Sequence, residues 1–296
     1  MTMQLTAPRS DDHRLVGMIH GAIGMAIFAG SLPATRVAVL ELDAIFITAG
    51  RAAGAGILAV LLLAATRQKL PSRADVIPLL VVAGGVVLGF PLLTALALQS
   101  VPSAHAIVFV GLLPLVTALF AVLRATEKPR PAFWLWASAG SAAVCLYALW
   151  HSTGGFAAPD LLMLAAIVVC GLGYAEGSRL AKRLGSWQII CWALVISLPV
   201  SLPATFAYRP DDAAAVALPA WLGFGYVTLF SMFIGFFFWY RGLALGGIAR
   251  VSQVQLFQPF LGLTLAALVL GETVSPDIAV VAVVIGFCVW QARKHA

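Results

Sequence analysis

The sequence predicts an all-α membrane protein with ten transmembrane helices, built as two inverted five-helix repeats. Three observations lead to this prediction. Of the 296 residues, 61% are hydrophobic and only 10% are charged, with a mean hydropathy of +0.99. A soluble domain carries roughly 25% charged residues, so lipid must solvate much of this apolar surface. The apolar residues also form membrane-length runs, and several residues recur at one fixed offset along the chain.

Apolar runs separated by Arg, Lys, Pro and Gly define the predicted spans. A transmembrane helix needs about 20 mostly apolar residues at a rise of about 1.5 Å per residue. The predicted helices cover residues 15–35, 43–65, 75–97, 103–123, 132–150, 160–181, 187–206, 218–240, 247–270 and 277–292.

The connections between these runs alternate between basic and acidic. Basic residues gather in 66–73, 124–130, 182–183, 241–250 and 293–294, whereas only Arg36 and Arg209 lie in the other set of connections. Because cytoplasmic loops carry an excess of Lys and Arg, we expect both termini in the cytoplasm. The net charge of +6 is scattered among these connections, so it does not indicate nucleic-acid binding.

The two halves of the chain share a pattern of proline and glutamate. One offset of 145 residues relates Pro114, Glu127 and Pro131 to Pro259, Glu272 and Pro276. Because five helices fit within this offset, the two halves must be inverted in the membrane. The alternative is that these residues merely mark helix ends. The predicted organisation is a cytoplasmic tail at 1–14, repeats at 15–150 and 159–292, a periplasmic linker at 151–158 and a cytoplasmic tail at 293–296.

The same residues resemble the paired EamA modules of the drug/metabolite transporter superfamily, which place a Pro-led helix before a Leu-Gly-Glu turn. The second half carries this turn as Leu270-Gly271-Glu272, whereas the first half reads Ala125-Thr126-Glu127. Arg51 resembles the Arg common in the second helix of such modules. The resemblance implies a ten-helix transporter.

Three shorter stretches resemble the YddG-type branch of this superfamily: 32–36, 173–179 and 187–192. This resemblance implies export of aromatic amino acids across the bacterial inner membrane by alternating access around a central cavity. Direction and substrate come from the resemblance alone. Other metabolites, drugs and polyamines remain as alternative substrates.

Amide side chains before Pro259 are the main candidates for substrate contact. Gln255 and Gln258 lie near the predicted midplane, where lipid cannot satisfy their donors and acceptors. Pro259 also removes a backbone N–H and frees a carbonyl. The alternative is that these amides join helices, a role that contributes about 0.6 kcal/mol each.

Further candidates lie on the other helices. Pro114 and Gly111 are predicted to break the fourth helix as Pro259 breaks the ninth, giving two hinges. Phe28, Phe109 and Tyr174 could stack on an aromatic substrate, and Ser31 joins them as a polar candidate. Most other aromatic residues, including 236–240, are interpreted as an interfacial belt or lipid-facing bulk.

Charged candidates lie nearer the predicted cytoplasmic side. Glu176 is the one acidic residue inside a predicted span, with Arg179 at i+3 and Arg183 at i+7. It is a candidate gate or coupling group, and a paired interfacial Glu is preferred over a proton relay. His20 could titrate near neutral pH, although a structural role is preferred.

Other functional classes lack support in the sequence. It contains no HExxH, GxSxG or P-loop motif, so neither a membrane enzyme nor a self-contained ATP-driven pump is indicated. The four cysteines lie singly in apolar runs and indicate neither a metal nor a redox site. We expect no cofactor, no ATP and no nucleic-acid partner. The expected partners are the bilayer and a small amino-acid substrate, with the monomer as the working unit.

Overall fold

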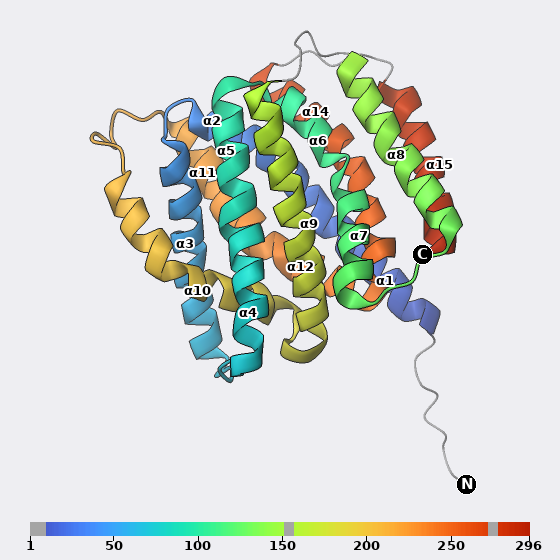
Figure 1. Ribbon diagram of the computed structural model, residues 1–296. Coiled ribbons are helices and arrows are strands. Elements are labelled where there is room, and N and C mark those ends of the chain that lie inside the picture. The colour runs from blue at the N-terminus through green and yellow to red at the C-terminus, as the bar shows by residue number, and fades with distance from the viewer. Residues whose placement is uncertain (1–9, 151–156, 272–277) are drawn as a thin grey trace.

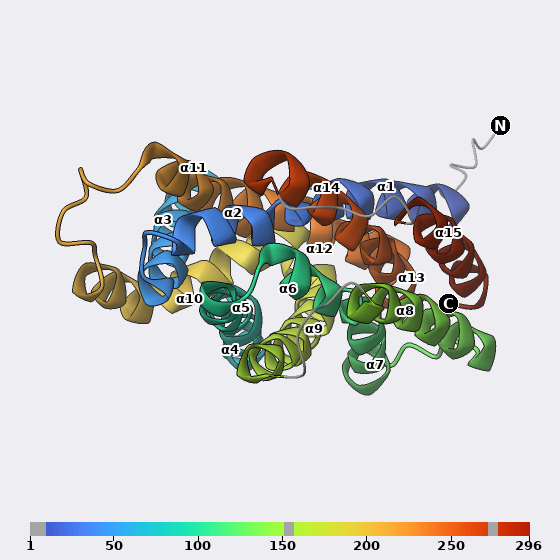
Figure 2. The same ribbon diagram turned by 90° about the horizontal axis from the view of Figure 1, so that it is seen from above.

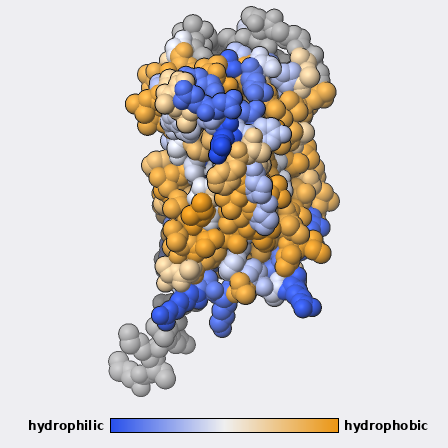
Figure 3. Space-filling model, turned by 90° about the vertical axis from the view of Figure 1, so that its left-hand side faces the viewer, coloured by the Kyte–Doolittle hydropathy of each residue, from blue (hydrophilic) through white to orange (hydrophobic). Residues whose placement is uncertain are grey.

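The computed structural model describes residues 10–150, 157–271 and 278–296. These residues form helices and connecting loops without a β-strand. The helices pack side by side in one elongated bundle (Figures 1 and 2). An apolar band covers the middle of the face in Figure 3, with hydrophilic residues at its two ends. Outward-facing residues such as Leu268 (78% exposed) and Val283 (74% exposed) suit contact with lipid.

The elements of the first half include a short π-helix. In chain order they are α1 (Ser10–Ala29), α2 (Ser31–Val39), α3 (Ala44–Ala65), α4 (Arg73–Val82), the π-helix η1 (Ala83–Gly89), α5 (Phe90–Ser100), α6 (Ser103–Val110), α7 (Leu113–Ala125) and α8 (Pro131–Trp150).

The second half adds a second π-helix and a 3-10 segment. Its elements are α9 (Ala158–Leu184), α10 (Ser186–Ala207), α11 (Leu218–Tyr226), the π-helix η2 (Val227–Ile234), α12 (Gly235–Gly246), α13 (Ile248–Ser252), the 3-10 helix η3 (Gln253–Phe257), α14 (Gln258–Leu270) and α15 (Ile278–His295).

Several of these segments can cross a bilayer. Within the described residues, seven are long and apolar enough: Asp12–Val39, Ala44–Ala65, Arg73–Ser100, Ala158–Leu184, Ser186–Ala207, Leu218–Gly246 and Ile248–Leu270. The prediction of an all-helical, multi-pass membrane protein is therefore confirmed. Each range predicted as a helix overlaps a helical segment, and α9 begins at the end of the predicted linker 151–158, most of which lies outside the described residues.

Local sequence signals explain many helix ends. The Asp43 side chain caps α3 by accepting from the amides of Ile45 (2.7 Å) and Phe46 (3.1 Å). Ser72 and Asp75 form a capping box at the start of α4. Gly247 has a φ of +86°, which lets the chain turn directly from α12 into α13.

Elements of the two halves match in length and conformation. α7 and α14 each contain 13 residues and begin 145 residues apart, at Leu113 and Gln258. Each has a proline in its first turn and ends at a residue in the left-handed region. The π-helices η1 and η2 occupy nearly the same matched positions. Of the six residues that defined the offset, Glu272 and Pro276 lie outside the described residues.

The first-half turn keeps its geometry although it lacks the Leu-Gly of the second. Thr126 has a φ of +57°, where Gly271 has +68°. The Glu127 carboxylate then accepts hydrogen bonds from the backbone amides of Ile248 and Ala249, both at 2.8 Å. This carboxylate caps the first turn of α13 and so joins the two halves.

The first segment departs from the predicted single helix at 15–35. The chain turns at Gly30, and α2 starts at Ser31. Pro33 has no amide N–H, so the carbonyl of Ala29 lacks its usual helical donor. The interruption therefore follows from the positions of Gly30 and Pro33, and it opens the backbone inside the bundle.

The start of α1 and the end of α15 lie at one end of the bundle (Figure 1). A Cβ on Gly17 would lie 2.5 Å from the amide nitrogen of Gly246, at the end of α12. The Arg130 amide donates to the carbonyl of His295 at 2.9 Å, in the last turn of α15. The basic connection at 124–130 therefore lies beside the C-terminal helix.

The αL position of Thr126 gives a stability prediction. The left-handed region costs an L-residue about 1–2 kcal/mol, and glycine avoids this cost. Glycine is also more flexible in the unfolded chain, which offsets part of the gain in stability. We expect Thr126→Gly to raise the free energy of unfolding by about 0.5 kcal/mol, as measured by thermal unfolding in detergent. Gly271→Ala is the matched control and should be destabilising by about 1 kcal/mol. A loss of stability in Thr126→Gly would show that the Thr side chain contributes more than its backbone costs.

Candidate functional site

Buried polar groups meet at the interruption between α1 and α2. The carbonyl of Phe28, in the last turn of α1, accepts from Nε2 of Gln258 at 3.4 Å. Gln258 is the first residue of α14, directly before Pro259, and is only 8% exposed. The two interrupted segments, α1–α2 and η3–α14, therefore contact each other through a backbone carbonyl and an amide side chain.

A second polar contact continues from this point into α3. The hydroxyls of Ser31 and Ser231 share a hydrogen bond of 2.7 Å, and Arg51 Nη2 donates to the Ser231 hydroxyl at 3.1 Å. Ser231 lies in the π-helix η2, whose wider turn is a feature often found at functional sites. Arg51 is 5% exposed, Ser231 3% and Ser31 8%, so the network is internal.

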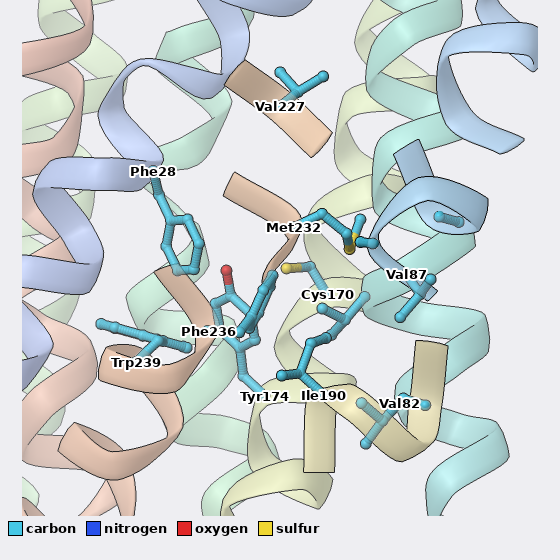
Figure 4. Close-up of a cluster of buried hydrophobic side chains, with 14 of the residues drawn as sticks. Phe28, Val82, Val87, Cys170, Tyr174, Ile190, Val227, Met232, Phe236 and Trp239 are labelled. Carbon is cyan, nitrogen blue, oxygen red and sulfur yellow. The ribbon is translucent and has the colours of Figure 1, made fainter. Parts of the chain in front are cut away.

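Four aromatic rings pack together beside these polar groups (Figure 4). Phe28 lies 4.8 Å from Phe236 and 6.0 Å from Trp239 between ring centroids. Tyr174, from α9, lies 5.3 Å from Trp239 and 6.1 Å from Phe236. We call Phe28, Tyr174, Phe236 and Trp239 the aromatic cluster. Rings at such distances attract one another, and another ring could join them.

Several buried polar atoms near the aromatic cluster have no hydrogen-bond partner within the protein. They are Arg51 Nε, Trp239 Nε1, Gln258 Oε1 and both amide atoms of Gln255. Leaving a buried donor or acceptor unpaired costs about 1–3 kcal/mol. Such a concentration of unpaired groups suits a place where water or a polar ligand supplies the missing partners.

Tyr174 connects the amide of Gln255 to the aromatic cluster. Its phenol lies close enough to interact with the Gln255 side chain. The Gln255 contact falls outside normal hydrogen-bond geometry, since both atoms of that amide remain without a partner. Tyr174 thus brings η3 and α9 together beside the rings of α12.

Other predicted site residues lie on the neighbouring segment. The helix is interrupted at Gly111 and Leu112, between α6 and α7, and Pro114 sits in the first turn of α7. Phe109 is half-buried, and its ring centroid lies 5.8 Å from that of His105. None of the ring contacts given by the structure joins Phe109 to the aromatic cluster.

Glu176 follows Tyr174 of the aromatic cluster by two residues in α9 and is paired with two arginines. Its carboxylate accepts from Arg124 Nε at 3.1 Å and from the guanidinium of Arg179. Glu176 is 0% exposed, whereas both arginines are nearly half-exposed. Arg183, which was predicted to share this face, pairs instead with Asp75 of α4. The ion pairs tie α9 to α7 and to α4.

The sequence had suggested that Glu176 is the only buried acid, and the structure shows otherwise. Asp75 (4% exposed) and Asp160 (3% exposed) are also buried, and each caps the start of a helix. Asp160 Oδ1 also lies 2.6 Å from His105 Nε2. His20 is far less buried, and its Nδ1 donates to the Val16 carbonyl at 2.8 Å. The structure does not bring His20 into contact with the aromatic cluster.

The sequence interpretation missed four residues of this centre, of which Ser231 had no signal beyond being a polar residue in an apolar run. Phe236 and Trp239 were assigned to a belt, but α12 continues to Gly246 and carries both rings into the interior, at 5% and 0% exposure. Arg51 was noted only through the family resemblance. The signal for it was present, because it is a lone charge within the apolar run of α3.

The described residues contain no group of three or more His, Cys, Asp or Glu side chains that could hold a metal ion. The chemistry of the centre is therefore that of amides, hydroxyls, one guanidinium and aromatic rings. Groups of these kinds are able to bind and orient a small molecule.

The fold and this centre define a multi-pass membrane protein with polar groups enclosed in an apolar bundle, as in proteins that carry small molecules across lipid. The chain belongs to the EamA-like transporter family, which matches residues 15–149 and again residues 157–290. It is therefore a membrane transporter, and the predicted EamA resemblance is confirmed.

Two known proteins are similar to it over nearly their whole length. The uncharacterized transporter YdeK of Bacillus subtilis (strain 168) is 58% identical over 280 residues, covering 95% of this chain and 98% of the relative. A solved structure described as "Crystal structure of protein" has a TM-score of 0.74 at 18% identity, covering 96% of this chain and 99% of that chain. The second likeness concerns the fold alone.

The Gln258 contact gives a prediction for the candidate site. We expect Gln258→Leu to reduce transport at least tenfold while membrane abundance stays unchanged, because leucine fills similar space without polar groups. Gln99→Leu makes the same change in an exposed side chain and should transport as the wild type does. Normal flux through Gln258→Leu in liposomes would remove this residue from the site.

Proposed function

We propose that this transporter exports amino acids, with aromatic ones preferred, from the cytoplasm by alternating access around the aromatic cluster. The observation that carries the proposal is the position of four rings beside unpaired Gln255, Gln258 and Arg51 atoms. An aromatic side chain would stack on the rings, where each ring pair contributes about 0.5–1.5 kcal/mol. Its ammonium and carboxylate groups would supply the missing hydrogen-bond partners.

We further propose that ten helices cross the membrane as two inverted repeats. The matched lengths of α7 and α14, the paired π-helices and the paired left-handed turns support this. Packing supports it as well, since α3 pairs with α10 and α8 with α15, while α1 packs on α12 as α9 packs on α5. If the two halves changed places, the same pairings would result, as expected for a repeat.

The orientation follows from the basic connections. The start of α1, the end of α15 and the basic stretch 124–130 lie at one end of the bundle (Figure 1). An excess of Lys and Arg marks the cytoplasmic side, so we place this end and both termini in the cytoplasm of a bacterial cell, with the protein in the inner membrane.

Ion pairs supply a means of closing this cytoplasmic end. Glu176 joins α9 to α7, and Asp75 joins α4 to Arg183 of α9. Opening toward the cytoplasm would have to separate these pairs, in which the arginines are half-exposed and the carboxylates are buried. Pro114, Gly111 and Pro259 would supply the hinges, and Arg179 would hold Glu176 in the closed state.

Transport of aromatic amino acids is tested in two systems. Bacteria expressing the chain should resist toxic phenylalanine and tryptophan analogues, and purified protein in liposomes should conduct labelled phenylalanine faster than labelled glycine. Liposomes without the protein serve as the inactive control. A protein that moves neither phenylalanine nor tryptophan would contradict the substrate and favour another small metabolite or a drug. Chemical conversion of the added compound would instead indicate a membrane enzyme.

Energy coupling gives a separate prediction. The described buried acids, Glu176, Asp75 and Asp160, all bind Arg or His and lie outside the aromatic cluster. A carboxylate that carries protons with substrate is therefore absent from this described centre, and we expect facilitated or loosely coupled export. A pH jump imposed on liposomes should not drive accumulation of phenylalanine. Accumulation that follows the proton gradient would overturn this mechanism but not the substrate.

A further inference from the structure

Arg51 is a charged residue enclosed within the bundle. It is the eighth residue of α3, about 10 Å along the helix from its start at a rise of about 1.5 Å per residue. Its side chain is 5% exposed and points to Ser231 of η2 rather than to either end of the bundle. Enclosing a guanidinium in an apolar interior is unfavourable unless an anion compensates its charge.

Within the described part of the chain, no carboxylate forms an ion pair with Arg51. Arginine ion pairs there include those of Arg124, Arg179 and Arg183, which face Glu176 and Asp75. Arg51 donates to one neutral hydroxyl, and its Nε has no hydrogen-bond partner. Every buried acid described above is already paired, so the centre carries an uncompensated positive charge.

Two serines fix the position of the Arg51 side chain. Ser231 binds one of its nitrogens, and Ser31 in turn fixes Ser231. A guanidinium has five N–H donors in a planar fork that matches a carboxylate in two parallel hydrogen bonds. The two serines connect this fork to the aromatic cluster, since Ser31 follows Phe28 by three residues and Ser231 precedes Phe236 by five.

We propose that Arg51 binds the carboxylate of the transported molecule, so that the transporter selects small carboxylates over their amides. This inference deepens the proposed function, since it assigns one end of the amino acid to a named side chain. The competing explanation is structural, in which Arg51 only joins α3 to the π-helix η2 through Ser231.

Competition measurements test this selectivity. Uptake of labelled phenylalanine into liposomes is measured against unlabelled phenylalanine, phenylpropionate and phenylalaninamide. We expect the amide to need at least a tenfold higher concentration than phenylalanine for equal inhibition of the wild type. Arg51→Gln should lower phenylalanine flux at least tenfold, and Arg51→Lys should lie between, because lysine keeps the charge without the fork. Arg73→Gln, at an exposed position in α4, is the matched control and should keep normal flux.

Thermal unfolding in detergent separates a binding role from a structural one. Without ligand, Arg51→Gln should unfold at the same temperature as the wild type or higher, because an uncompensated buried charge has been removed. Phenylalanine and phenylpropionate should raise the unfolding temperature of the wild type but not of Arg51→Gln. A lower unfolding temperature for ligand-free Arg51→Gln, with carboxylate stabilisation retained, would overturn the proposal.

The outcomes distinguish this inference from the proposed substrate. If the wild type moves no aromatic amino acid, the same unfolding assay with leucine, glutamate and their amides still tests Arg51. Stabilisation by a carboxylate that Arg51→Gln loses would support the inference while the aromatic substrate fails. Stabilisation by no carboxylate, or equal inhibition by phenylalanine and its amide, would refute the assignment of Arg51.

Discussion

Lipid offers no hydrogen-bond partners, and this constraint determines how the protein is built. The backbone satisfies it by folding into helices, and the few places where helices are interrupted face the interior. At the Gly30 turn the Phe28 carbonyl meets the Gln258 amide, and at η2 the Ser231 hydroxyl meets Ser31 and Arg51. These contacts gather polar groups, which lipid cannot hydrogen-bond, at one centre in the interior. The unpaired atoms that remain there define what a bound molecule must supply.

The distribution of charge follows the same constraint. Toward the bundle ends, buried carboxylates have basic side chains as partners: Glu176 two arginines, Asp75 Arg183 and Asp160 His105. Each of these acids is buried, whereas its partner is partly exposed to water. The centre differs, since Arg51 meets only a hydroxyl. Acids are thus paired toward the ends of the bundle, and the centre lacks an anion. This distribution suits a protein that binds a small anionic group in its interior.

Much of this architecture could be predicted because it depends on local sequence. Apolar run length gave the helices, and single residues such as Asp43 and Gly247 gave their ends. The features that could not be predicted join residues distant in sequence. The contact between Ser31 and Ser231 spans 200 positions, and Trp239 is buried because α12 packs closely on α1 near Gly24. The Gly30 interruption was missed because hydropathy remains high through it, although Pro33 gave a local signal.

The 145-residue offset separates residues that build the scaffold from residues that give the centre its chemistry. Scaffold positions match between the halves, as Pro114 matches Pro259 and Thr126 matches Gly271. Four polar positions of the centre have apolar counterparts, Val110 for Gln255, Leu113 for Gln258, Val86 for Ser231 and Ile196 for Arg51, whereas Ser31 corresponds to Glu176. If these four polar groups were needed to join helices in a repeat, the same need would arise in both halves. Because these four occur once, the centre is asymmetric and can hold a molecule with different ends in one orientation.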